Sequence, residues 1–437
     1  MTNHNTSFFF TRRFLPLFIT QFLGAFNDNL FRQAIVILIT FGMAKEVGMQ
    51  PAALNSMAAG LFILPYFLFS ALAGQLADKY EKSGQIFWIK LWEVILMLIG
   101  GLGFYLSSLP LLFTVLCGLG LQSTFFGPIK YGILPDLVDR KDLLTANAYF
   151  EASTFIAILG GTIFAGLFIA TGNGVTNVVL LAIGLAIVGT LVGRRVPKVT
   201  PGAPDLVITK NIFVSTRSQL KRAWNDTISK RAILGASWIW LYGSVYLAQT
   251  PVITKEHLGG DETLATLFMA CSSVGIGLGS FLSSRMLKGE ISAKLAKPAL
   301  LAMFAVSLVF YAVLPTAAPA GPLIGVSEFL SLPFNWLIIS LFISSSILSG
   351  MIIVPLYAIL QNNAAPNERA RMMAANNIIN SGFMTGGAIA VITLLTFGLT
   401  SADALLVMGV ANLLVVPVVT KLRKEMEAGP TTDSITS

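Results

Sequence analysis

Long apolar stretches recur along the chain from Phe14 to Thr420, with short polar segments between them. Each stretch is close to the roughly 20 residues that a helix needs to cross a bilayer. Whole helical turns within them lack the polar face that a soluble protein's helix keeps toward water. The pattern predicts an all-α membrane protein with about 12 transmembrane helices, at residues 14–42, 53–75, 85–107, 110–133, 145–171, 175–193, 231–254, 263–287, 298–316, 336–361, 370–398 and 402–420.

The distribution of basic residues predicts the orientation of these spans. With the N-terminus placed in the cytoplasm, 24 of the 29 Lys and Arg residues fall in cytoplasmic segments and three fall inside spans. Only Lys45 and Lys255 lie on the opposite side. Positive charge is enriched in cytoplasmic loops of membrane proteins, so both termini are expected in the cytoplasm. The net charge of +8 is then a topology signal, and we expect no nucleic-acid partner.

The longest polar stretch between spans follows the sixth of them and divides the chain into two sets of six. We expect an N-terminal six-helix half at 1–193, a basic cytoplasmic linker at 194–230, a C-terminal six-helix half at 231–420 and a cytoplasmic tail at 421–437. Within the linker, residues from Lys210 to Lys230 have the composition of a basic helix that lies on a membrane surface.

Two short matches indicate that the halves arose by duplication. Tyr131, in the sequence Tyr-Gly-Ile-Leu, matches Tyr357, in Tyr-Ala-Ile-Leu, and the Ala-Asn pair ending at Asn147 matches the pair ending at Asn376. Both matches join the fourth span of a half to its fifth. Parallel repeats of this kind are the arrangement of major facilitator transporters.

The loop between the second and third spans contains Gly74, Asp78 and Lys79 in a spacing that resembles the loop signature of the major facilitator family. The equivalent loop of the second half keeps Gly279 and Arg285 but has Ser283 in place of the acid. In that family the loop locks the cytoplasmic side in one state. An aspartate at a helix end is suited to this role because it can pair with a helix dipole and with an arginine across the interface between halves.

Charged residues inside a span are costly and therefore indicate function. The first span contains Asn27, Asp28 and Arg32, with the acid one helical turn before the base. This pattern fits either a self-neutralising pair or a site for a substrate headgroup, and three consecutive polar residues favour the second. Local pairing explains Lys90 and Glu93 in the third span.

The fourth and fifth spans hold a second group of candidates. Lys130 either extends to the cytoplasmic surface or offers a cation to a phosphate, and Glu151 is either its structural partner or a second ligand. Asn147 lies one turn before Glu151, and in the second half Asn376 and Asn380 take the equivalent places without charge. The charged chemistry is therefore expected in the first half.

Three motifs resemble those of bacterial lysophospholipid transporters. They are the stretch from Gln21 to Asn29, the stretch from Gly127 through Lys130 and Tyr131 with the residues around Asn147 and Glu151, and the stretch from Val354 to Gln361. The resemblance also covers the transporter part of larger fusions with a glycerophospholipid acyltransferase.

This resemblance implies a major facilitator fold and the flipping of lysophospholipids, such as lysophosphatidylethanolamine, toward the cytoplasmic leaflet of the inner membrane for reacylation. It implies Asp28, Lys130 and Glu151 as headgroup ligands and a cytoplasmic acyltransferase as partner. The family places an arginine inside the seventh span, where this chain has only Arg231 at the cytoplasmic start.

Three other functions compete with this one. A proton-coupled exporter or importer of a drug, siderophore or other metabolite would use Asp28 or Glu151 as the proton carrier. An acyltransferase would need His and Asp separated by four residues, a pattern absent around the two histidines, and no phosphate-binding loop is present. A scaffold would not need costly buried polar groups. We therefore expect a monomeric transporter without enzymatic activity, cofactor or metal.

Overall fold

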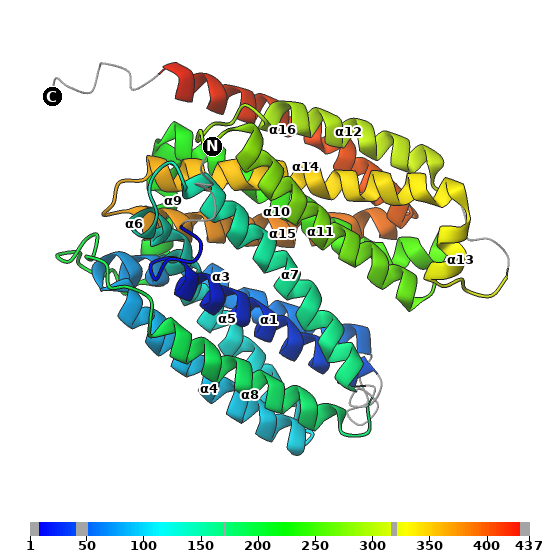
Figure 1. Cartoon of the computed structure of the whole chain (residues 1–437), viewed down its shortest axis with the longest axis horizontal. Helices are drawn as coiled ribbons and strands as arrows, with labels where there is room; N and C mark the ends of the chain where they lie inside the picture. Colours follow the sequence, from blue (N-terminus) through cyan, green and yellow to red (C-terminus); the bar gives the residue numbers. More distant parts are fainter. Residues whose placement is uncertain (1–7, 41–50, 170, 316–320, 429–437) are drawn as a thin grey trace. The chain divides into compact units, whose positions relative to one another are not determined.

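The computed structural model describes residues 8–40, 51–169, 171–315 and 321–428, and their regular structure is helical. Three helices are short or peripheral: α6 (Leu134–Leu137), α9 (Ile212–Asn225) and α13 (Val326–Ser331). The twelve long helices are α1 (Leu15–Leu38), α3 (Pro51–Lys79), α4 (Lys82–Tyr105), α5 (Leu109–Gly132), α7 (Leu143–Ile169), α8 (Gly174–Gly193), α10 (Thr227–Glu256), α11 (Glu262–Met286), α12 (Ala296–Val313), α14 (Pro333–Asn363), α15 (Arg369–Thr396) and α16 (Ser401–Ala428) (Figure 1).

Each long helix coincides with a predicted span, most within a few residues at either end. Ten of the twelve are long and apolar enough to cross a membrane by length and composition alone. The other two, α1 and α10, are interrupted by polar side chains. The last helix continues to Ala428, so the segment predicted as a tail from residue 421 begins as helix. Lys45, used above for orientation, lies outside the described residues.

The chain divides into two compact units, which are described separately. Unit 1 comprises residues 1–146, 153–222 and 364–378, and unit 2 comprises residues 147–152, 223–363 and 379–437. The start of α15 therefore packs with unit 1, and one segment of α7 packs with unit 2. This division does not test the boundaries of the two halves predicted above, which stay a prediction.

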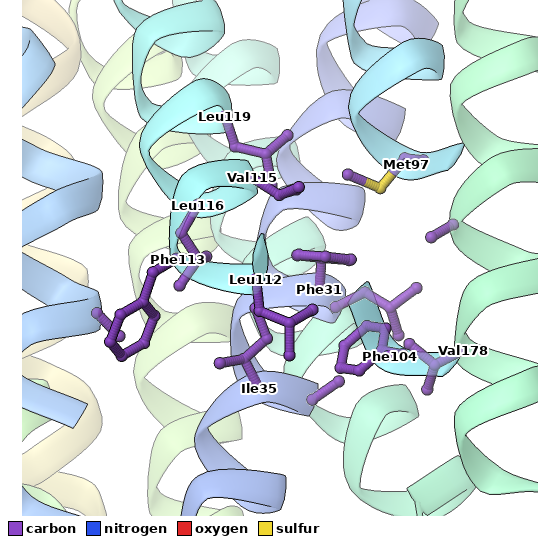
Figure 2. Packing of buried hydrophobic residues seen from close by; sticks show 14 of the residues in the cluster. Phe31, Ile35, Met97, Phe104, Leu112, Phe113, Val115, Leu116, Leu119 and Val178 are labelled. Carbon is purple, nitrogen blue, oxygen red and sulfur yellow. The ribbon is translucent and has the colours of Figure 1, made fainter. Parts of the chain in front are cut away.

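Unit 1 has an apolar core between α1, α4, α5 and α8. Figure 2 shows Phe31 and Ile35 of α1 beside Leu112 of α5, with Phe104 of α4 and Val178 of α8 in the same cluster. Water does not drive association of apolar helices inside lipid, so close van der Waals packing must hold this core together.

Unit 2 is built around the contact between α11 and α14, where small residues let the backbones approach closely. A Cβ atom on Gly275 would lie 2.7 Å from Ser346 Cβ, and one on Gly350 would lie 2.9 Å from Ser280 N. In unit 1, α3 and α5 pack in the same way, with Gly120 against the carbonyl of Phe62. These are the second and fourth long helices on each side of the linker, as expected of a duplication.

The linker contacts the short segment between α3 and α4. The helix predicted between Lys210 and Lys230 is confirmed over Ile212–Asn225, and Asp226 then caps the start of α10. Glu81 caps α4 by accepting hydrogen bonds from the backbone of Ser83 and Gly84 and also accepts one from Val199 of the linker. Burial raises the pKa of the Glu81 carboxyl, but these hydrogen bonds outweigh burial and hold that pKa below its ordinary value.

Candidate functional site

The centre of the polar cluster in unit 1 is Glu93, a fully buried residue of α4. Its carboxylate forms a short ion pair with Lys90. It also accepts hydrogen bonds from Asn27 Nδ2 of α1 at 2.9 Å and from Gln122 Nε2 of α5 at 3.0 Å. A buried charge must be compensated by partners of this kind. Sequence reasoning treated Lys90 and Glu93 as a local pair and missed their partners on two other helices.

Asp28 lies beside this cluster and is held by the residue of α5 that follows Gln122. Its Oδ2 atom accepts a hydrogen bond from Ser123 Oγ of α5 at 2.6 Å. Within the described part of the chain, Asp28 Oδ1 and Asn27 Oδ1 are buried and accept no hydrogen bond. Two buried acceptors without donors on neighbouring residues are unusual in a native structure and suit a ligand.

Arg32 does not form the direct ion pair with Asp28 that one of the two interpretations of the first span required. Its Nη2 atom donates to Asn29 Oδ1 at 2.7 Å, and its guanidinium lies over the ring of Phe62, 5.6 Å from the centroid. Among the described residues, Asp28 and Arg32 form no ion pair within 4.0 Å. Opposite charges one turn apart on α1 therefore remain available to a ligand.

Gln21, one turn and a half before Asn27, extends the polar surface of α1 to α7. Its amide makes a short hydrogen bond to Thr154, and its Oε1 atom accepts one from Ser153 Oγ at 3.1 Å. No sequence pattern indicated these contacts, because each joins residues more than 130 positions apart.

Lys130 and Tyr131 end α5, which continues as a helix through Pro128. The Lys130 ammonium lies over the ring of Tyr131 at 4.8 Å from the centroid. Lys130 is half-buried and belongs to unit 1, whereas Glu151 is fully buried and belongs to unit 2. The suggested bridge between them therefore stays a prediction.

In unit 2, Asn147 and Gln361 form a reciprocal amide pair. Asn147 Nδ2 donates to Gln361 Oε1 at 2.7 Å, and Gln361 Nε2 donates to Asn147 Oδ1 at 3.0 Å. Both side chains are buried. The repeat places Asn376 at the position of Asn147 and Pro135 at the position of Gln361, so the equivalent amide partner is missing.

Because that partner is missing, the side chain of Asn376 is left without a hydrogen bond in the described part of the chain. It is fully buried in unit 1, and neither its Oδ1 nor its Nδ2 has a hydrogen-bond partner among the described residues. Asn380, one turn later and in unit 2, is instead satisfied: it accepts from Ser237 Oγ at 2.6 Å and lies 3.4 Å from the hydroxyl of Tyr357. Of the two, Asn376 is the better candidate ligand.

Gly74, Asp78 and Lys79 were predicted in a loop, but they lie in the last turns of α3, which continues to Lys79. Asp78 contacts the start of α15, and both segments belong to unit 1. Asp78 is fully buried and accepts the backbone N–H groups of Ala370 at 3.0 Å and Arg371 at 3.1 Å. Its Oδ2 atom also accepts Arg371 Nε at 3.0 Å. The carboxylate thus satisfies orphan donors at a helix N-terminus, where its charge favours the dipole. Gly74 makes room, since a Cβ there would lie 2.7 Å from Ala374 Cβ.

The remaining loop candidates have other surroundings. Lys79 Nζ donates to the carbonyl of Leu206 in the linker at 2.8 Å. Arg285 is exposed at the end of α11. Arg231 forms a short ion pair with Glu425 of α16, so this arginine, the only one near the position expected from the transporter motif, is engaged within unit 2.

Comparison with known proteins gives the family and the fold. The family described as Major Facilitator Superfamily matches residues 17–388. The chain is 29% identical over 383 residues to the lysophospholipid transporter LplT of Pectobacterium carotovorum, covering 86% of this chain and 84% of that protein. It is 27% identical to the lysophospholipid transporter LplT of Escherichia coli O1:K1, covering 82% of each.

Solved transporters of low sequence identity have the same fold. The human organic anion transporter MFSD10 matches with a TM-score of 0.71 at 13% identity, covering 93% of this chain and 99% of that one. The transporter FucP in its outward conformation matches with a TM-score of 0.68 at 12% identity, covering 94% of this chain and 98% of that one. The predicted architecture of twelve helices is therefore confirmed.

Proposed function

Because the chain belongs to the Major Facilitator Superfamily, we propose that it moves a lysophospholipid, such as lysophosphatidylethanolamine, across a bacterial inner membrane toward the cytoplasmic leaflet. The names of its relatives from Pectobacterium and Escherichia coli support this substrate class. Their similarity extends over more than four fifths of both chains, which supports one shared activity for the whole transporter.

The observation that carries the substrate class is the unpaired charge on α1. A zwitterionic headgroup has a phosphate and an ammonium a short distance apart. Asp28 has a free buried acceptor, and Arg32 lies one turn away without being paired to it. In this proposal the ammonium binds Asp28 and the phosphate binds Arg32, both through charge-assisted hydrogen bonds.

We also propose further headgroup ligands from the candidate residues of each unit. Lys130 supplies a second cation for the phosphate, and Glu151 a second acid for the ammonium. Asn376 offers an amide whose two polar atoms have no partner within the described residues. The Asn147–Gln361 pair and Asn380 take a positioning role, because their own hydrogen bonds already occupy them.

Alternating access would require the contact at Asp78 to break and re-form. We take the Asp78–Arg371 contact as a cytoplasmic gate, consistent with an orientation that has both termini in the cytoplasm. The transporter would act as a monomer and deliver its substrate to a cytoplasmic lysophospholipid acyltransferase. It would perform no chemistry on the lipid itself.

Flipping of fluorescent lysophosphatidylethanolamine in proteoliposomes tests this function. Asp28→Asn, Lys130→Gln and Glu151→Gln should each slow transport at least tenfold, the effect of losing about 1.4 kcal/mol of binding. The double variant Asp139→Asn/Lys141→Gln is the matched control, because it removes an exposed ion pair. Full activity in all three site variants would refute the headgroup site.

A gradient experiment separates this proposal from coupled export of a metabolite. Flipping should persist when ionophores collapse the proton and sodium gradients, whereas a coupled exporter would stop. Uptake of drugs or siderophores with no response to lysolipid would refute the substrate class while leaving the family assignment intact.

A further inference from the structure

The linker helix α9 is attached to α3 by only one of its faces. Gln75 Nε2 of α3 donates to Ser215 Oγ at 2.5 Å, and Gln219 Nε2 donates to the carbonyl of Ala71 at 2.5 Å. Ser215 and Gln219 are buried and stand one turn apart. These contacts fix the rotation of α9 about its axis and therefore decide which side chains face outward.

The outward face of α9 combines apolar and basic side chains. Phe213 is 80% exposed and Val214 is 55% exposed. Arg217 and Lys221 follow at one-turn spacing from Phe213 and are also exposed. A large exposed phenyl ring next to two cations is typical of a helix in the headgroup region of a membrane.

The charge of this face has one sign and no internal compensation. The sequence of α9 from Ile212 to Asn225 contains no acidic residue. Arg222 is engaged by an ion pair with Glu368 on another side of the helix. Within the described residues, neither Arg217 nor Lys221 has an ion-pair partner within 4.0 Å, and neither does Lys210 just before the helix. The face is therefore complementary to an anionic surface.

The attachment points also give the depth of α9. Ala71 lies eight residues before the end of α3 at Lys79, which is about 12 Å along a helix. Since Met57–Lys79 is a candidate membrane span, α9 lies beside the last turns of that span rather than beyond them. We therefore infer that its exposed face lies at the level of lipid headgroups.

We propose that Lys210, Phe213, Arg217 and Lys221 form a binding surface for anionic phospholipid headgroups of the cytoplasmic leaflet. Phe213 inserts among the upper parts of the acyl chains, and the three cations contact phosphates. Each basic residue near an anionic membrane surface favours association by roughly fivefold. This surface is separate from the substrate site and does not depend on which lipid is transported.

Hydrogen–deuterium exchange of the full chain in lipid nanodiscs tests the proposal. Amides of residues 210–222 should exchange more slowly in nanodiscs that contain phosphatidylglycerol than in pure phosphatidylcholine. The difference should shrink at high salt, because exposed charges are screened. Arg217→Gln/Lys221→Gln should weaken the association of this face with the anionic surface by roughly 25-fold, two factors of five. The lipid-dependent difference in exchange should then largely disappear.

Three further measurements interpret this result. The control Lys141→Gln/Lys294→Gln, which removes two exposed cations elsewhere, should keep the difference. Phe213→Ser should raise exchange in both lipids. Unchanged exchange in phosphatidylcholine for Arg217→Gln/Lys221→Gln would show that the contacts of Ser215 and Gln219 still hold the helix.

Equal exchange with and without phosphatidylglycerol would overturn the proposal. Slower exchange that requires an added cytoplasmic acyltransferase, whatever the lipid, would assign the face to a protein partner and would also overturn it. Neither result depends on transport, so failure here is distinguishable from failure of the lysophospholipid function.

Discussion

Replacing Asp78 by Asn tests whether the contact between α3 and α15 is a gate. The carboxylate accepts two backbone N–H groups and Arg371 Nε. An amide keeps one acceptor oxygen and presents a donor to the others. With its oxygen kept toward Ala370, the variant loses two bonds to a charged group, from Arg371 N and Arg371 Nε, at about 1.5–3 kcal/mol each. A loss of about 3 kcal/mol shifts the equilibrium toward separation roughly 100-fold.

Arg371→Gln should have a smaller effect, because Asp78 keeps both backbone donors at the start of α15. Only the charge-assisted bond to Nε is lost, about 1.5 kcal/mol, which corresponds to roughly tenfold. The difference between the two variants therefore measures how much of the contact comes from Asp78 capping the backbone N–H groups at the start of α15. Glu290→Gln, which removes an exposed pair with Lys294, is a control for loss of charge.

Maleimide labelling of Ser70→Cys reports the equilibrium, in a background with Cys117 and Cys271 replaced by Ser. Ser70, Gly74 and Asp78 stand one turn apart on the same face of α3, and Ser70 is fully buried. Labelling should accelerate about 100-fold in Asp78→Asn and about tenfold in Arg371→Gln. Equal rates for the two variants would refute capping. An unchanged rate in Asp78→Asn, together with a lower melting temperature, would make the contact structural only.

Three further changes test the packing. Glu93→Gln should destabilise unit 1 by about 3–5 kcal/mol, because it leaves Lys90 buried and unpaired; thermal unfolding in detergent measures this, and Lys90→Met/Glu93→Leu should recover most of it. Gly350→Ala should cost about 1–3 kcal/mol through overpacking, whereas Gly184→Ala, with open space around it, should be neutral, and equal melting temperatures would contradict the close packing. Glu81→Gln should cost about 1 kcal/mol at neutral pH. Since the folded pKa of Glu81 is lowered, this difference should shrink as pH falls through the ordinary glutamate pKa of about 4.3 and vanish below the folded pKa, and a difference that persists in strong acid would exclude charge as its cause.

The helices were predictable because the signal for each is about twenty residues long. Polar interruptions weaken that signal in α1 and α10, yet the basic residues in adjacent loops still mark the ends of these helices. The end of α16 was not predictable in this way. Beyond Thr420 its residues are charged, and nothing in their hydropathy distinguishes a helix that continues from a tail. The helix continues to Ala428, with an ion pair between Arg423 and Glu427 one turn apart.

The site was predictable as a set of residue types but not as a set of contacts. Asn27, Asp28 and Asn29 are adjacent, and successive residues of a helix point about 100° apart. They therefore point in different directions: Asn27 donates to Glu93 of α4, Asp28 accepts from Ser123 of α5, and Asn29 donates to the carbonyl of Ala25.

These separate contacts explain why neither interpretation of the first span, as a self-neutralising pair or as a headgroup site, was complete. Asn27 has a structural contact that binds α1 to a buried ion pair, while Asp28 keeps an unpaired oxygen beside it. The costly pair of Lys90 and Glu93 fixes the position of Asn27 and so the rotation of α1. Asp28 and Arg32 have separate partners instead of each other, since Asp28 accepts from Ser123 and Arg32 donates to Asn29. The structural pair and the proposed ligands are thus neighbouring parts of one arrangement, and no sequence spacing within a single span reveals it.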